Sequence, residues 1–152
     1  TTTLSPLHAA GIFRSLVQGR ALQIPWSKHI PSQFIPDRPI ALPNPALKPN
    51  TYYGMMKMMK ATTSVGTART AFKKNIYSYH RKRLLTGGKT GTIDGGSPQG
   101  RYDWFAGFAQ DRKDPQQKII IVVMQHHGKI WTLKSSHVAA LLINQWAKHN
   151  LK

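Results

Sequence analysis

The sequence contains no cysteine and no glutamate, and it has no long apolar run. Without cysteine the chain can form no disulfide and has no thiol chemistry. No stretch approaches the ~18 apolar residues that a membrane-spanning helix needs. The 152 residues, of which 40% are hydrophobic, are enough for one packed domain.

Acidic residues of either kind are scarce. Five aspartates stand against 22 lysines and arginines, which gives a net charge of +17. Such a charge favours anionic partners: nucleic acid, phospholipid head groups or an anionic cell-wall polymer. A basic surface without a specific ligand fits the composition as well. Nucleic acid is the least expected partner, because the basic residues are scattered and no nucleic-acid-binding motif is present.

The stretch around Lys89 combines groups that could hold a peptide-like substrate. It reads Gly-Gly-Lys-Thr-Gly-Thr over residues 87–92. If this stretch is a strand, Lys89 and Gly91 point to one face, while Thr90 and Thr92 point to the other. An ammonium and two hydroxyls can bind a carboxylate, and the glycine lets a ligand approach closely. A backbone N–H there can face a developing oxyanion.

Two other interpretations of this stretch are open. A phosphate-binding loop needs a glycine five residues before Gly88 and a helix directly after the threonine. Position 83 is instead Arg83, and the Gly-Thr-Ile-Asp-Gly-Gly that follows Thr90 is a poor helix start. The other interpretation is an ordinary hairpin with a surface lysine, since a second apolar run over residues 102–109 follows a Gly/Pro/Ser turn.

The wider sequence resembles one protein family. Residues 89–92, Lys-Thr-Gly-Thr, resemble the third motif of penicillin-binding proteins and serine β-lactamases, and residues 100–109 look like the strand beside it. Residues 3–10 are similar to the (Ser/Thr)-Pro-Leu-x-x-Ala helix start of penicillin-binding transpeptidases. Gly-Thr-Ala at residues 66–68 resembles another segment of that family. The four pieces occur in the family's order, and the resemblance is weakest over residues 20–50.

This resemblance implies a fold, a reaction and a site. The fold would be α+β, with three antiparallel strands packed with helices, and residues 1–152 would be the C-terminal portion of one transpeptidase domain. The reaction would be acyl transfer from a D-Ala-D-Ala peptide through an acyl-serine, without cofactor or metal. Lys89 and Thr92 would be catalytic, the lysine in proton transfer and the Thr92 N–H as an oxyanion donor. Thr90, Gly91 and Thr92 would bind the substrate.

Two motifs of the family are absent from the sequence. It contains neither Ser-x-x-Lys, which carries the nucleophile, nor Ser-x-Asn. Both precede the Ser-Pro-Leu helix in the family, so we expect a preceding part of the polypeptide to supply the nucleophile. The implied partners are that N-terminal part and a peptidoglycan stem peptide or β-lactam. The implied location is the bacterial periplasm or the outer face of the cytoplasmic membrane.

The resemblance leaves the exact activity open. Transpeptidase, carboxypeptidase and β-lactamase are all compatible with these motifs. A non-catalytic penicillin-binding sensor or a degenerate domain of the same fold is a further alternative.

Periodicity and turn residues predict the regular elements. Four helices are expected, over residues 6–18, from an Asn50 cap to Met59, over 67–74, and after Ser135 or Ser136. Three strands are expected, over residues 89–94, 101–110 and 118–125. The last strand is apolar on both faces, so it should be covered on both sides and paired at its outer edge.

Three finer expectations concern packing. Residues 20–50 contain seven of the ten prolines, which predicts an irregular excursion over the surface, with a flexible linker as the alternative. The basic and aromatic residues 77–83 predict a solvated connector, with RNA binding as the alternative. Helical spacing places Ile12 in the first helix and Leu141 and Leu142 in the last on the buried faces.

Overall fold

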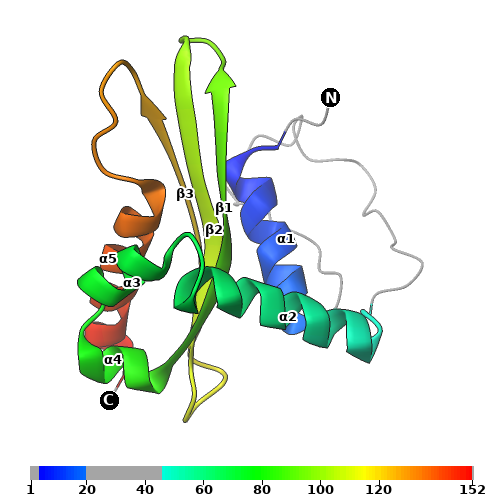
Figure 1. The fold of residues 1–152 in the computed structure, drawn as a ribbon. Helices are drawn as coiled ribbons and strands as arrows, with labels where there is room; N and C mark the ends of the chain where they lie inside the picture. The colour runs from blue at the N-terminus through cyan, green and yellow to red at the C-terminus, as the bar shows by residue number, and fades with distance from the viewer. Residues whose placement is uncertain (1–3, 20–45, 152) are drawn as a thin grey trace, which may run out of the picture.

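The computed structural model describes residues 4–19 and 46–151, which form five helices and one three-stranded antiparallel sheet (Figure 1). The helices are α1 (Pro6–Gln18), α2 (Pro49–Ser64), α3 (Arg69–Asn75), α4 (Ser78–Arg83) and α5 (Ser135–Asn150). The strands are β1 (Leu84–Gly95), β2 (Gly100–Asp111) and β3 (Lys118–His127). The predicted α+β class is confirmed. The expected excursion lies outside the described residues except for residues 46–50.

The sheet is a meander in which β2 is the central strand. Both strand pairs are antiparallel, and Thr90 of β1 and Val123 of β3 flank Phe105 of β2. The β1–β2 turn contains Gly95 and Gly96, whose φ angles of 125° and 85° strongly favour glycine. The Gly/Pro/Ser turn therefore closes the hairpin that the sequence predicts.

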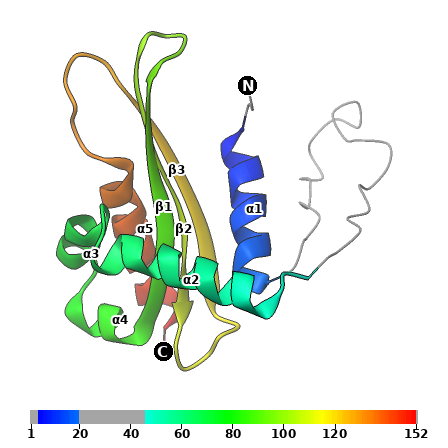
Figure 2. The ribbon, with the colours of Figure 1, turned by 45° about the vertical axis from the view of Figure 1, so that its right-hand side comes forward.

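Helices cover the sheet on both faces (Figures 1 and 2). Phe105 and Phe108, three residues apart on β2, are both fully buried and point to opposite faces. Phe105 packs with Phe72 of α3 and with alanines of α5, whereas Phe108 packs with Met56 of α2 and Val17 of α1. Burying one such phenylalanine contributes roughly 1.5–3 kcal/mol. These two cores hold β1 between the two helical layers.

Helix α1 begins and ends where the sequence predicts. The Ser5 hydroxyl accepts a hydrogen bond from the His8 N–H, 3.2 Å, and Pro6 occupies the first turn. The C-cap residue is Gly19, with a φ of 68°. Ile12 is 48% exposed, which contradicts its predicted place on the buried face. Its side chain instead lines a groove beside β1.

Helices α2 and α5 start with different caps from those expected. Helix α2 begins at Pro49 rather than after Asn50, because proline has no N–H to leave unpaired in the first turn. The N-terminus of α5 is capped from another element: the Ser135 N–H donates to the carboxylate of Asp103 in β2, 2.5 Å. Asp103 is 4% exposed, so this bond ties α5 to the sheet from within the core.

The buried face of α5 also differs from the prediction. Leu141 and Leu142 are 48% and 49% exposed, so their expected burial is wrong. The side chains that face the sheet are mostly small, and they include Ala139, Ala140 and Ala147. Small residues let the helix approach the sheet closely, and this moves the two leucines to the flanks.

The segment before β1 is mostly exposed, as the prediction of a solvated connector implies, but it folds into a helix. It forms α4, in which His80 is 4% exposed and lies 2.8 Å from Oδ1 of Asn144. Arg83, at its end, binds both carboxylate oxygens of Asp111 at 2.6–3.1 Å. Strand β1 then begins at Leu84, five residues earlier than expected.

Candidate functional site

A groove lies between the β1–β2 hairpin and helix α1. Its volume is about 330 Å³. It is lined by Leu4, Ala9, Ile12, Phe13, Lys89, Thr90, Gly91, Ile93, Trp104 and Ala106. The lining is mostly apolar, while Lys89 and Gly91 of β1 are themselves exposed to solvent. Three of the four predicted site residues border this groove.

Among the described residues that border the groove, Lys89 has the only charged side chain. It is paired with Ala106 in the register of the hairpin, and its ammonium donates to the backbone carbonyl of Thr90. Within residues 4–19 and 46–151 there are two ion pairs, and neither involves Lys89. Its positive charge is therefore not neutralised by a carboxylate in the described part of the chain.

Thr90 and Thr92 follow Lys89 on the strand but differ in their surroundings. The Thr90 hydroxyl lies 2.7 Å from the hydroxyl of Thr67, while Thr92 is exposed. Thr67 belongs to the Gly-Thr-Ala segment that joins α2 to α3. A side chain on Gly66 would begin 3.0 Å from the Cα of Thr62, so glycine permits the close turn there. Thr67 was not among the predicted site residues, although the Gly-Thr-Ala motif that contains it pointed to this segment.

The two glycines beside Lys89 have different reasons to be glycine. A Cβ on Gly88 would lie 2.6 Å from the Ala106 carbonyl oxygen and 2.6 Å from the Phe105 ring, so folding itself requires glycine. A Cβ on Gly91 would meet only the Cβ of Trp104, at 3.9 Å. The described residues therefore leave room for a side chain or a ligand at Gly91, on the groove side of β1.

The arrangement suits binding of a carboxylate beside an extended strand. It provides the Lys89 ammonium, the Thr90 side chain and a β1 edge that no strand of the described residues covers. No serine, cysteine or histidine lines the groove, so its described part offers a binding rim without a nucleophile and base. In the same part of the chain, no three potential metal ligands gather. No described helix has both the length and the apolar character to cross a membrane.

Comparison with known proteins agrees with this combination of fold and motif. Residues 1–147 match the family model described as the penicillin-binding protein transpeptidase domain. No curated protein and no solved structure matches the chain. The family match covers nearly all of the 152 residues and includes the whole sheet and most of α5. The chain therefore belongs to the penicillin-binding protein transpeptidase domain family.

Proposed function

We propose that the Lys89 groove is one side of the acyl-transfer site of a penicillin-binding D,D-transpeptidase. The substrate is the D-Ala-D-Ala end of a peptidoglycan stem peptide, and a β-lactam takes its place as an inhibitor. The nucleophilic serine comes from a part of the protein outside these 152 residues. The reaction is transfer of the peptide acyl group to that serine and then to an acceptor amine.

Each residue of the motif has a separate role in this proposal. Lys89 attracts the substrate carboxylate and assists proton transfer to and from the serine. The hydroxyls of Thr90 and Thr92 bind the carboxylate. The Thr92 N–H donates to the oxyanion of the tetrahedral intermediate, and Gly91 lets the substrate lie close to the strand.

The observation that carries the proposal is the position of Lys89 in the groove. Its ammonium has no acidic partner among the described residues, and it lies beside the vacant space at Gly91. Family membership supports a transpeptidase-type role, and transpeptidase domains of this kind act on the cell wall outside the cytoplasm. We therefore propose the periplasm, or the outer face of the cytoplasmic membrane, as the location.

A fluorescent penicillin tests the proposal on the full natural chain. We expect covalent labelling, and Lys89→Ala should slow it by roughly 10²–10⁴-fold, the usual contribution of a positioned proton-transfer group. Lys82→Ala removes an exposed lysine from α4 and should label like the unaltered protein. Equal labelling rates in all three proteins would contradict the role of Lys89.

A second assay, release of D-alanine, separates a transpeptidase from a non-catalytic penicillin sensor. A transpeptidase releases D-alanine from a D-Ala-D-Ala peptide at a rate that depends on Lys89. A sensor becomes labelled but releases no D-alanine. Labelling of the isolated 152-residue chain would show that the nucleophile lies within it, contrary to the proposal.

A further inference from the structure

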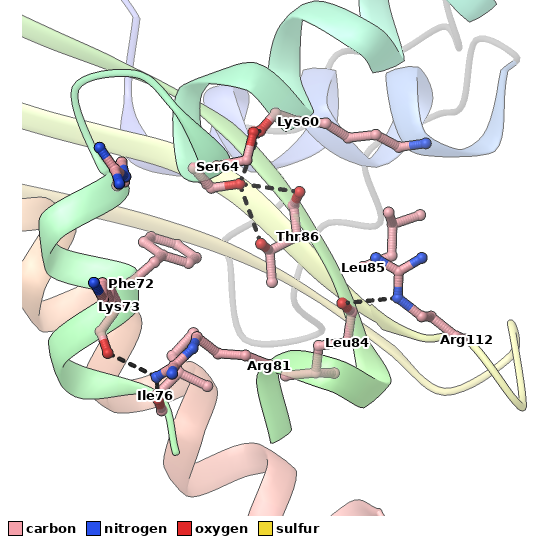
Figure 3. Close-up of a pocket in the computed structure, with 12 residues that line it drawn as sticks. Lys60, Ser64, Phe72, Lys73, Ile76, Arg81, Leu84, Leu85, Thr86 and Arg112 are labelled. Carbon is pink, nitrogen blue, oxygen red and sulfur yellow. Dashed lines mark hydrogen bonds between the residues drawn. The ribbon is translucent and has the colours of Figure 1, made fainter. Parts of the chain in front are cut away.

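A second cavity, separate from the Lys89 groove, lies beside the first residues of β1 (Figure 3). Its volume is about 410 Å³, and no described residue lines both cavities. Of the described residues that line it, five are cationic and none is acidic. They come from α2, α3, α4 and the residue after β2: Lys60, Arg69, Lys73, Arg81 and Arg112.

The two arginines nearest the strand are held in place by backbone carbonyls. Arg81 donates through Nη1 to the carbonyl of Lys73, 2.7 Å, and to that of Ile76. Arg112 donates through Nε to the carbonyl of Leu84, 3.2 Å. A guanidinium has five N–H donors, so each arginine keeps further donors for a ligand. Their anchoring lowers the entropy that a ligand must remove when it binds.

The described residues do not neutralise this cluster. Asp94 and Asp111 are paired with Arg101 and Arg83, neither of which lines the cavity. Asp103 accepts from the Ser135 N–H, and Asp114 accepts from a backbone N–H in its own turn. These are the four aspartates of the described ranges, and each is engaged elsewhere. No aspartate of the described ranges therefore offsets the five positive charges around this hollow.

We propose that this cavity, which we call the cation pocket, binds a phosphate group. Arginine guanidinium forks match the oxygens of phosphate and bind it in a bidentate manner. A phosphate can present up to two negative charges to the cluster, which a single carboxylate cannot do. The buried side chains of Phe72, Ile76 and Leu84 form an apolar wall on one side of the cavity.

The cation pocket and the Lys89 groove are both lined by residues of strand β1. Thr86 lines the pocket, and Lys89 lies three positions further along β1, roughly 10 Å of strand. A phosphate-bearing ligand held at the start of β1 can therefore lie beside the acyl-transfer groove without occupying it. The shared chemistry is the phosphate group, whether it belongs to a free anion or to a lipid head group.

Calorimetry with inorganic tripolyphosphate tests the proposal on the full natural chain. At about 0.15 M ionic strength, where the screening length is ~8 Å, only nearby charges contribute strongly. The pocket variant combines Lys60→Gln, Arg69→Gln and Lys73→Gln, and leaves the anchored arginines intact. The control variant combines Lys57→Gln, Lys74→Gln and Lys82→Gln, which remove the same charge from exposed positions on α2, α3 and α4 outside the pocket.

We expect the pocket variant to bind tripolyphosphate on the order of tenfold more weakly than the unaltered protein, and the control to change by less than about twofold. Undetectable binding to the unaltered protein, or equal losses in both variants, would overturn the proposal. Equal losses would mean that the +17 charge attracts anions diffusely.

Once tripolyphosphate binding is shown to depend on the cation pocket, binding to phosphatidylglycerol vesicles identifies the source of the phosphate. Binding to phosphatidylglycerol vesicles that is lost only in the pocket variant assigns the site to a lipid head group. Pocket-dependent binding of tripolyphosphate without vesicle binding assigns it to a free phosphate. Preferential binding of a random DNA duplex, reduced equally by both variants, would count against a phosphate pocket.

Discussion

The hydroxyl of Thr67 lies 2.7 Å from the hydroxyl of Thr90, although 23 residues separate them in the sequence. The contact joins the Gly-Thr-Ala segment before α3 to the Lys-Thr-Gly-Thr segment of β1. Two stretches that look like independent motifs in the sequence therefore form one unit in the structure. Thr67 can hold the Thr90 hydroxyl in a fixed orientation beside the Lys89 groove.

Thr67→Val tests this link because valine keeps the branched shape and removes the hydroxyl. We expect a small loss of stability, about 0.5–1.5 kcal/mol for one hydrogen bond, and a several-fold slower labelling by fluorescent penicillin in the full natural chain. Thr70→Val, at an exposed position on α3, is the matched control. Labelling of the Thr67 variant at the control's rate would show that this hydroxyl does not position Thr90.

The two glycines of the motif should respond in opposite ways to alanine. Gly88→Ala places a methyl group 2.6 Å from a backbone oxygen and an aromatic ring, so we expect a loss of about 1–3 kcal/mol in unfolding free energy. Gly91→Ala meets no atom closer than 3.9 Å, and it should fold normally but impair labelling by penicillin. Thermal unfolding measures the first effect and labelling rate the second. A stable Gly88 variant, or a fully active Gly91 variant, would contradict the respective assignment.

The Arg83–Asp111 pair predicts a specific loss of stability in acid. The hydrogen bonds from the Arg83 guanidinium lower the pKa of Asp111 from 3.8 to about 2. Because the pKa in the folded protein is lower than in the unfolded chain, the stabilisation is complete above about pH 4 and disappears as the pH falls toward 2. Denaturant unfolding at several pH values should show this slope in the unaltered protein.

Asp111→Asn should remove that slope, because the amide has no proton to gain in this range. Asp94→Asn is the matched control, since Asp94 also pairs with an arginine but its side chain is 68% exposed. The control should retain most of the acid dependence between pH 4 and 2, because exposed pairs contribute little. An Asp111 variant with an unchanged pH profile would show that this pair does not govern acid stability.

Local signals predicted the parts of the fold that depend on neighbouring residues. The Ser5 cap and the Gly19 stop define α1, and the glycine turn at residues 95–96 closes the β1–β2 hairpin. The predictions failed where a distant partner decides the outcome. Asp103, not a local serine hydroxyl, caps α5, and alanines rather than Leu141 face the sheet.

By itself, the sequence determined the α+β class, the hairpin around Lys89 and the motifs of the transpeptidase family. It did so because turns, caps and strand alternation depend on residues close together in the chain. The tertiary structure decided that Thr67 meets Thr90, and that five cations from different elements surround one pocket. Those distances follow from how the helices pack on the two faces of the sheet, which spacing along the chain does not specify.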